Sequence, residues 1–292
     1  MRLRQLRAGD RDAVLQIWNA GARYDPLAPA LLDEKLRDDD VEPGLALAAI
    51  HAGDLAGFVV AVLRPTGVGY VKLLAVAPQY QRCGIGSALL EAVEGELARR
   101  GARSIRMLES APNYLTPGID RRYREAIAFV AARGYARVGE ARNLSVDLTR
   151  EYPARAVAGG IEVRRATAAD GPTVARFLDG LWATWKAEAG AALANAPPSL
   201  HLALRAEHII GFAAWDANNR GTGWFGPMGI APEARRSGIG CALLHRCLDD
   251  MRRQGHDAAV IAWVDNAPFY VRCAGAAPAR TFLRFEKILY AD

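Results

Sequence analysis

Two short glycine-containing motifs are the residues of this sequence whose type and spacing most clearly suggest chemistry. QRCGIGSALL begins at Gln81, and RRSGIGCALL begins at Arg235, 154 residues later. In both motifs, two glycines one residue apart directly precede an apolar run with helical periodicity. Unpaired amide N–H groups at a helix N-terminus attract phosphate, and glycine lets a ligand approach the backbone closely. The motifs therefore predict phosphate-binding turns.

Two common phosphate-binding motifs do not match these turns. A dinucleotide fingerprint requires a third glycine three residues after the second, but Leu89 and Leu243 occupy those positions. A P-loop requires Gly-Lys followed by Ser or Thr, and neither copy contains it. What remains is Gln/Arg-x-x-Gly-x-Gly, preceded by Val/Ile-Ala-Pro. The alternative is that each motif is a structural glycine turn that begins a helix and binds no ligand.

The same offset of 154 residues aligns the sequence around both motifs. Without a gap, it places residues 57–58 on 211–212, residues 76–78 on 230–232, and Gly101 on Gly255. Self-similarity at this range indicates a duplicated domain. We therefore expect an N-terminal domain at residues 1–148, a linker without periodicity at 149–160, and a C-terminal domain at 161–292.

Each half contains the same order of expected elements, which must position the two turns. A first strand (3–7; 161–165) and a helix precede three short strands (45–51, 55–63 and 70–76; 200–205, 209–216 and 224–230). The helix after each turn ends at Gly101 or Gly255, and a further strand (104–108; 258–264), a helix and a last strand follow. This order predicts an α/β (α+β) fold, with a mostly antiparallel mixed sheet flanked by helices in each half.

The motif and its flanking strands resemble the pyrophosphate-binding motif of the GNAT acetyltransferase superfamily, in two tandem copies that cover almost the whole chain. The resemblance implies acetyl-CoA as cosubstrate. Its pyrophosphate would lie on the amides of residues 82–87 and 236–241, and its pantetheine beside the two preceding strands. The implied cofactor-binding residues are Val76, Gln81, Arg82, Cys83, Gly84, Ile85, Gly86 and Ser87, together with Ile230, Arg235, Arg236, Ser237, Gly238, Ile239, Gly240, Cys241 and Asn266.

The resemblance also implies an acid for the departing thiolate, commonly a Tyr on the helix after the fifth strand. In the second half, DNAPFYVRCAGA places Asn266 and Tyr270 in the matching positions. In the first half, Val130 takes the position of the Tyr. We therefore expect a general acid only in the C-terminal half, the alternative being that Tyr270 is a packing residue. A phenol with a pKa of about 10 can protonate a thiolate.

The general base is less clear, because the fourth strand of each half lacks a carboxylate. Asp216 at the end of the third strand is the leading candidate, and His201 and Glu109 are others. A water relay would make a visible base unnecessary. Met228 and Trp263 could line an acyl pocket, although core packing is the simpler role for both.

The first half carries 14 extra residues between Leu108 and Val130, including the turn signal Pro117-Gly118. We expect a loop that covers its own domain or docks on the other. Similar loops occur in bacterial tandem GNAT proteins, including glucosamine N-acetyltransferases. Those also resemble the second half in FGPMGIAPEARRSGIGCALLHRCLDDMRRQG and FYVRCAGA, whereas the tail ARTFLRFEKIL departs from them.

Composition limits the class of protein further. The 292 residues carry a net charge of +5, with scattered arginines and no basic block, so we expect no nucleic-acid partner. No apolar run is long enough to span a membrane, and the N-terminus lacks a signal-peptide pattern. The four cysteines form no C-x-x-C pair, which predicts neither a disulfide framework nor a zinc site and favours the cytoplasm.

The leading hypothesis is an acetyl-CoA-dependent N-acetyltransferase that acts on the primary amine of a small molecule, for which an amino sugar is the narrower alternative. We expect a monomer or homodimer without metal. The runner-up is a non-catalytic acetyl-CoA-binding or sensing protein with degenerate halves. An acetyltransferase for basic protein tails would need an acidic groove, and the acidic run at residues 36–44 is explained more simply as a solvated loop.

Overall fold

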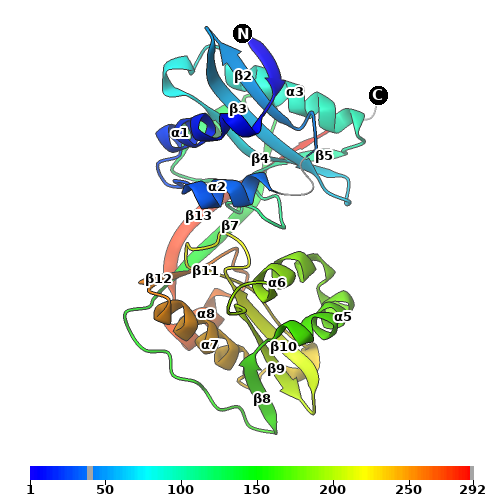
Figure 1. The fold of residues 1–292 in the computed structure, drawn as a ribbon, viewed down its shortest axis with the longest axis vertical. Coiled ribbons are helices and arrows are strands. Elements are labelled where there is room, and N and C mark those ends of the chain that lie inside the picture. Colours follow the sequence, from blue (N-terminus) through cyan, green and yellow to red (C-terminus); the bar gives the residue numbers. More distant parts are fainter. Residues whose placement is uncertain (38–41, 290–292) are drawn as a thin grey trace. The chain divides into compact units, whose positions relative to one another are not determined.

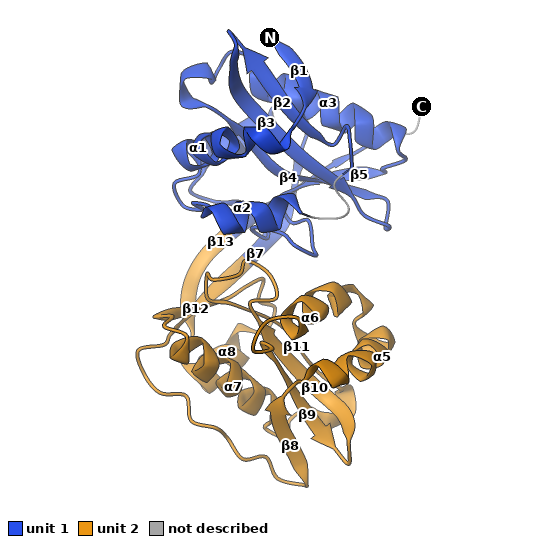
Figure 2. Cartoon of the chain, in the orientation of Figure 1, with its two compact units in different colours: residues 1–141, 282–292 blue, residues 142–281 orange. Residues whose placement is uncertain are grey.

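The computed structural model describes residues 1–37 and 42–289, so part of the acidic run at 36–44 lies outside the described residues. The chain forms two compact units. Unit 1 comprises Met1–Ala141 and Phe282–Asp292, and unit 2 comprises Arg142–Thr281 (Figure 2). Both are mixed α/β units that repeat the same order of helices and strands.

The sheet of unit 1 follows the expected order. It contains β1 (Arg2–Gln5), β2 (Ala46–His51), β3 (Asp54–Leu63), β4 (Val68–Val76) and β5 (Ser104–Met107), of which β2 to β5 are labelled in Figure 1. The short β6 (Ile119–Asp120) follows β5 in the chain. Neighbouring strands are antiparallel, except for the parallel pair β4 and β5. Its helices are α1 (Arg11–Gly21), α2 (Pro29–Leu36), α3 (Ile85–Arg99) and α4 (Arg124–Ala131).

The sheet of unit 2 repeats this arrangement. It contains β8 (Ile161–Arg165), β9 (Leu200–Arg205), β10 (His208–Trp215), β11 (Trp224–Ile230) and β12 (Ala258–Ile261), with β11 and β12 parallel. The helices are α5 (Gly171–Leu181), α6 (Lys186–Leu193), α7 (Ile239–Arg253) and α8 (Ala267–Ala274). The strands expected at 161–165, 200–205 and 224–230 have the observed bounds, and most others differ by one or two residues.

The last strand of each unit comes from the other repeat. Strand β7 (Ala136–Asp147) pairs with β12 in unit 2 through Leu144–Asp147, and β13 (Ala277–Ile288) pairs with β5 in unit 1 through Glu286–Ile288. The domain bounds expected at 1–148 and 161–292 follow the sequence repeat. The compact units differ from those bounds because the two repeats exchange their final strands.

The helices that follow the glycine motifs bury an apolar face against the sheets. In unit 1, α3 contributes Ile85, Leu89 and Val93 to a core that also contains Val59 and Val71 from the strands. Each of these side chains is at most 1 % exposed. The equivalent helix α7 of unit 2 packs in the same way against β10 and β11. Burial of these faces places the N-terminus of each helix beside the end of β4 or β11.

In both units, the parallel strand pair separates part of the way along. Strands β11 and β12 are paired only at Trp224–Val260 and Phe225–Ile261, and beyond these residues β11 continues to Ile230 paired with β10 but not with β12. In unit 1, the pairing of β4 and β5 ends at Val71–Met107. The register between β11 and β10 also shifts between Ala213 and Trp215, which indicates a bulge. Each unit therefore has an opening between its central strands.

In the part of the chain that the structure describes, no helix combines the length and the apolar character that a membrane span requires.

Candidate cofactor sites and active site

The first glycine of each motif has the backbone that the sequence predicts. Gly84 is the N-cap of α3 with φ of 80°, and Gly238 is the N-cap of α7 with φ of 86°. Two residues earlier, Arg82 and Arg236 both have φ of 64°. A Cβ atom on either glycine would have no atom within 4 Å. This open side leaves space for a ligand against the backbone, while the positive φ favours glycine.

The second glycine of each motif has a packing role that the sequence did not reveal. A Cβ atom at Gly86 would lie 3.3 Å from the Phe129 ring, and one at Gly240 would lie 3.0 Å from the Phe269 ring. Phe129 is on α4 and Phe269 is on α8. The second glycine therefore allows the late helix to pack directly on the turn. These equivalent contacts also support the alignment of Val130 with Tyr270.

A side chain ties each turn to the end of its preceding strand. Gln81 Nε2 donates to the Val76 carbonyl at 3.1 Å, and Arg235 Nε donates to the Ile230 carbonyl at 3.3 Å. Two further residues of the motif make local contacts. Cys83 Sγ donates to the Gln81 carbonyl, and Ser237 Oγ donates to the Ala234 carbonyl at 2.6 Å.

The first three amides of α3 and of α7 have no acceptor within their own helix, as at any helix N-terminus. They belong to residues 85–87 and 239–241. The side chains of Ile85 and Ile239 are each 1 % exposed in the core, so these residues could contact a pyrophosphate only through their amides. The turns thus fit the pyrophosphate of acetyl-CoA in their backbone and in their open glycine faces.

The residue three positions after the first glycine joins each turn to the following late helix. In unit 1, Arg133 of the α4 C-terminus donates a hydrogen bond to Ser87 Oγ and stacks over Phe129 at 3.8 Å. In unit 2, Cys241 forms a disulfide with Cys273, with the two Cα atoms 5.5 Å apart. The expectation that the cysteines form no disulfide is therefore wrong for this pair, which the fold brings together from positions 32 residues apart.

Tyr270 lies on α8 beside the opening between β11 and β12. Its ring centroid is 4.9 Å from that of Phe269, which packs on the turn, and 6.2 Å from that of Phe225, the last β11 residue paired with β12. Burial, and secondly the charge of Asp265, raise the pKa of Tyr270 to about 12. The phenol therefore keeps its proton at neutral pH. Asn266 is the exposed N-cap residue of the same helix.

The strand beside Tyr270 has open space at its bulge. A Cβ atom at Gly226 would have no atom within 4 Å, and the neighbouring Met228 is half-buried against the unit 2 core. Trp263, on the other side of the opening, donates its backbone amide to Asn143 Oδ1 at 3.0 Å. The position equivalent to Gly226 in unit 1 is Lys72, whose side chain is fully buried. The opening in unit 1 therefore has a different lining.

Candidates for the base lie in three different environments. Asp216, at the end of β10, accepts a hydrogen bond from the Gly221 amide at Oδ1 (3.1 Å), and its own amide donates to the Trp224 carbonyl. Its chain neighbour Trp215 pairs with Phe225 on the adjacent strand, and Tyr270 packs against Phe225. Glu109 is 2 % exposed and forms ion pairs with Arg106 and Arg284 in unit 1.

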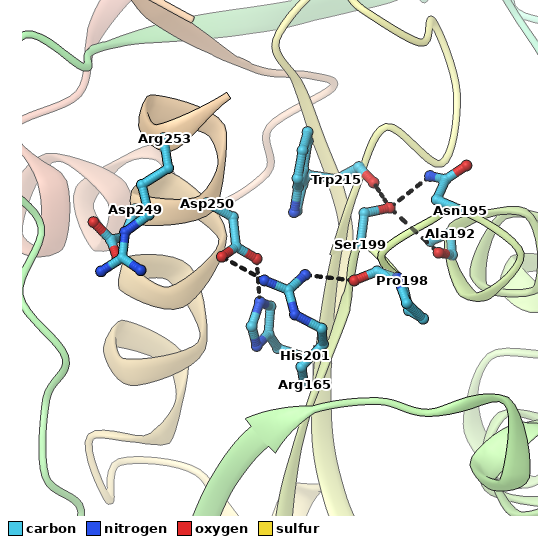
Figure 3. Close-up of polar contacts among 10 residues, drawn as sticks. All are labelled: Arg165, Ala192, Asn195, Pro198, Ser199, His201, Trp215, Asp249, Asp250 and Arg253. Carbon is cyan, nitrogen blue, oxygen red and sulfur yellow. Dashed lines mark hydrogen bonds and ion pairs between the residues drawn. The ribbon is translucent and has the colours of Figure 1, made fainter. Parts of the chain in front are cut away.

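The side chain of His201 is buried and contacts the half-buried carboxylate of Asp250. Its Nε2 lies 2.6 Å from Asp250 Oδ2, and Arg165 Nη2 donates to the other carboxylate oxygen at 2.6 Å (Figure 3). These contacts connect β9 and β8 to α7. Although burial opposes ionisation, the hydrogen bonds and charges of His201 and Arg165 lower the pKa of Asp250. The arrangement is best described as a structural ion pair.

Three site features could not be read from the sequence by motif alone. They are the packing of Phe129 and Phe269 on the glycine turns, the Cys241–Cys273 disulfide, and the buried Lys72. The sequence did contain one indication of the aromatic packing, because Phe129 and Phe269 each directly precede the aligned position of Val130 and Tyr270.

Comparison with known proteins agrees with this geometry. The sequence model described as acetyltransferase (GNAT) family matches residues 11–119 and 168–275, so that the two matches cover most of the chain. The chain therefore belongs to the GNAT acetyltransferase family and contains two copies of its domain. No curated protein matches the chain at a significant level.

Several solved structures share the tandem fold at low identity. A GCN5-related glucosamine N-acetyltransferase region of a fungal multi-domain GH3 β-N-acetylglucosaminidase superposes with a TM-score of 0.82 at 20% identity, covering 98% of this chain and 38% of that one. A GCN5-related N-acetyltransferase from Sphaerobacter thermophilus gives 0.75 at 19% identity, covering 98% and 95%. A tandem GNAT protein of the clavulanic acid biosynthesis pathway gives 0.71 at 18% identity, covering 100% and 99%. The chain spans little more than a third of the fungal protein.

Proposed function

We propose that the protein is an acetyl-CoA-dependent N-acetyltransferase whose chemistry takes place in unit 2, on the primary amine of a small molecule. The position of Tyr270 is the observation that carries this proposal. It lies at the opening between β11 and β12, on the helix that packs on the glycine turn through Phe269. Unit 1 has the turn but has Val130, 1 % exposed, in place of Tyr270.

When bound, acetyl-CoA supplies an activated acetyl thioester. The amides of residues 236–241 would hold its pyrophosphate, and the end of β11 at Ile230 would lie beside its pantetheine. Tyr270 holds a proton on its phenol oxygen up to a pH of about 12 and can give it to a departing sulfur. Asp216 would accept the proton of the amine through a water molecule, because it lies next to the strand that carries Trp224 and Phe225.

Two aromatic side chains beside β11 suit a substrate with an apolar ring face. After α5, Trp182 and Trp185 stack with their ring centroids 5.5 Å apart and an interplanar angle of 17°. Both are half-buried, and the Trp182 ring lies 2.9 Å from where a Cβ atom of Gly229 on β11 would be. Ligand sites commonly combine such aromatic walls with a few polar groups. Together with the similarity to a glucosamine N-acetyltransferase region, this supports an amino sugar as the acceptor.

The test compares Tyr270→Phe with Tyr135→Phe. Tyr135 is a buried tyrosine of unit 1 whose hydroxyl donates to Glu94 at 2.8 Å, so it controls for the loss of a phenol oxygen. Thiol release from acetyl-CoA with glucosamine as acceptor measures turnover, and calorimetry measures acetyl-CoA affinity. We expect Tyr270→Phe to lower kcat about 100-fold or more with the Kd changed less than twofold, since a general acid contributes roughly that much.

Two results would contradict the proposal. Equal losses in the two variants would indicate a general effect of losing a buried hydroxyl. Binding of acetyl-CoA without acetyl transfer to glucosamine or to a panel of other primary amines would favour the non-catalytic binding protein instead.

A further inference from the structure

Unit 1 contains an open pocket of about 570 Å³ that the proposed reaction does not use. It is lined by Arg23 and Tyr24, which follow α1, and by Arg121, Arg122, Arg124 and Glu125 at the start of α4. Its volume is in the range of small-molecule binding sites. The concentration of four guanidinium groups on one pocket contrasts with the scattered arginines elsewhere in the sequence.

One side of the pocket is ordered by a network of side chains. Arg122 donates to Asp120 from Nε at 2.9 Å and from Nη2 at 2.7 Å, and its guanidinium lies 3.8 Å from the centre of the Tyr24 ring. The Tyr24 amide donates to the hydroxyl of Tyr123, which donates to Asp25 Oδ2 at 2.9 Å. Because Asp120 is 3 % exposed, the edge of the Arg122 guanidinium that faces the interior is fixed by this carboxylate. The pocket thus has a positioned cation before any ligand binds.

The remaining arginines of the pocket are available to a ligand. Within residues 1–37 and 42–289, no ion pair joins Arg23, Arg121 or Arg124 to a carboxylate, and the Arg23 guanidinium lies 4.7 Å from the centre of the Tyr24 ring. Glu125 on the rim, Asp120 beneath Arg122 and the nearby Asp25 offset three of the four positive charges. The pocket therefore has about one positive charge in excess, and guanidinium groups bind phosphate and carboxylate in a bidentate manner.

The pocket is specific to unit 1. Arg121 and Arg122 belong to the 14 extra residues after Leu108, for which unit 2 has no equivalent, and Arg124 is the first residue of α4, where the aligned residue of unit 2 is Val264. That segment packs within unit 1, where Lys35 Nζ donates to Asn113 Oδ1 at 2.9 Å and β6 pairs with β13 at Leu283. The region after α5 that corresponds to Arg23 and Tyr24 instead carries Trp182 and Trp185. The inserted segment therefore gives unit 1 a charged pocket where unit 2 has an aromatic surface.

We propose that this pocket binds a small organic anion that carries a phosphate group or two carboxylates. The anion would be held by Arg121, Arg124 and the outer edge of Arg122. Two sources share this chemistry: a free metabolite and the phosphates of a coenzyme A molecule on the unit 1 turn. The pocket helix α4 also carries Phe129, which packs on that turn, so both sources require testing. A free anion is favoured because none of the residues that line the pocket belongs to the glycine turn at residues 81–87.

The test measures binding of inorganic phosphate and of citrate by calorimetry at low ionic strength. The test variant is Arg121→Gln with Arg124→Gln, whose side chains are exposed and unpaired within the described residues. The matched control is Arg2→Gln with Arg7→Gln, which removes the same charge from exposed positions of the same unit. We expect the Kd of at least one anion to rise tenfold or more in the test variant and to change less than twofold in the control.

A second arm identifies the source of the anion. Phosphate or citrate should bind equally well when the protein is saturated with coenzyme A, and the test variant should bind coenzyme A and 3′-dephospho-coenzyme A with unchanged affinity. Weaker binding of coenzyme A alone would assign the pocket to the cofactor and overturn the free-anion site. Absence of anion binding, or equal loss in the control, would overturn the site itself. Because acetyl transfer in unit 2 is measured separately, its failure is distinguishable from either result.

Discussion

The glycine turns of the two units share their backbone and differ in what surrounds them. Gly84 and Gly238 differ in φ by only 6°, and each is followed by a 15-residue helix. Around the unit 2 turn, Tyr270 and the open space at Gly226 border the separated strands. Around the unit 1 turn, Val130 and Lys72 occupy those positions and both are buried.

The connection between each turn and its late helix differs as well. Unit 1 uses a hydrogen bond from Arg133 to Ser87, whereas unit 2 uses the covalent Cys241–Cys273 bond. The backbone of the turn is thus the same in both repeats, whereas a tyrosine on the late helix and open space at the β11 bulge occur in unit 2 and not at the equivalent positions of unit 1. A turn of this kind indicates where a cofactor can bind, but the lining of the adjacent opening decides whether chemistry follows.

The largest expected effect is that of a carboxylate placed in the turn. We expect Gly238→Glu to weaken acetyl-CoA binding by about 1,000-fold, or about 4 kcal/mol, because the carboxylate repels pyrophosphate and displaces it from the amides. Gly84→Glu is the matched control, since both glycines have a positive φ near 80° and open space around Cβ. It should leave turnover within about threefold of the unaltered protein.

Native mass spectrometry with excess acetyl-CoA counts the cofactors bound per chain in each variant, and release of the thiol from acetyl-CoA measures its turnover. If Gly84→Glu abolished turnover while Gly238→Glu preserved it, the active unit would be unit 1 rather than unit 2.

The next effect concerns the covalent connection. Breaking the Cys241–Cys273 bond should lower the free energy of unfolding by about 3–4 kcal/mol, because the bond closes a loop of 32 residues in the unfolded chain. Ser87→Ala in unit 1 should cost about 1 kcal/mol, the usual contribution of a hydrogen bond. Chemical denaturation of Cys241→Ser/Cys273→Ser and of Ser87→Ala measures the two. Equal, small losses would show that the two connections are energetically equivalent.

The helices and strands of each repeat could be predicted from the sequence, because the alternation of apolar residues and the glycine pairs are both local patterns. Alternation predicted β8, β9 and β11 with their observed bounds, and the glycine pairs predicted the starts of α3 and α7. The offset of 154 residues placed these elements in equivalent positions. A local pattern does not state which sheet a strand joins, so the exchange of β7 and β13 between the units could not be inferred.

Parts of the candidate site depend on contacts between distant residues. Cys241 and Cys273 meet only after α7 and α8 pack, and His201 meets Asp250 across 49 positions. Lys72 lies in a pattern that correctly predicts a strand, but lysine is rarely fully buried, so its burial gave no signal. Which side of the turn faces a ligand became clear only from the space around Gly84 and Gly238.

A smaller effect should follow from the titration of Tyr270. Because burial raises its pKa to about 12 from an ordinary value of about 10, the folded state binds this proton more tightly than the unfolded state. Its contribution to stability is fully present below pH 10 and is lost as the pH rises toward 12, in total roughly 2–3 kcal/mol. Tyr270→Phe should remove this part of the alkaline loss, whereas the Val130 position of unit 1 has no proton to release.

Absorbance of tyrosinate as a function of pH checks the titration, and denaturation at pH 9 and pH 11 checks the stability. A Tyr270 that titrated at its ordinary pKa would show that it is solvated, and its role as a shielded acid would have to be abandoned.

The smallest expected effect separates the two second glycines, where the units are most alike. A Cβ atom would lie 3.0 Å from Phe269 at Gly240 and 3.3 Å from Phe129 at Gly86. Alanine stabilises a helix by up to about 1 kcal/mol relative to glycine, whereas overpacking costs about 1–3 kcal/mol. We expect Gly86→Ala to be nearly neutral, because Phe129 is on a helix that a hydrogen bond, rather than a covalent bond, joins to the turn, so that the helix can shift. Gly240→Ala should destabilise the protein by about 1 kcal/mol, because the Cys241–Cys273 bond prevents α8 from moving away.

Reduction of that bond should then remove the difference in the free energy of unfolding between the two alanine variants. Chemical denaturation with and without a reductant measures it, and a difference that survived reduction would place its cause in the turn itself.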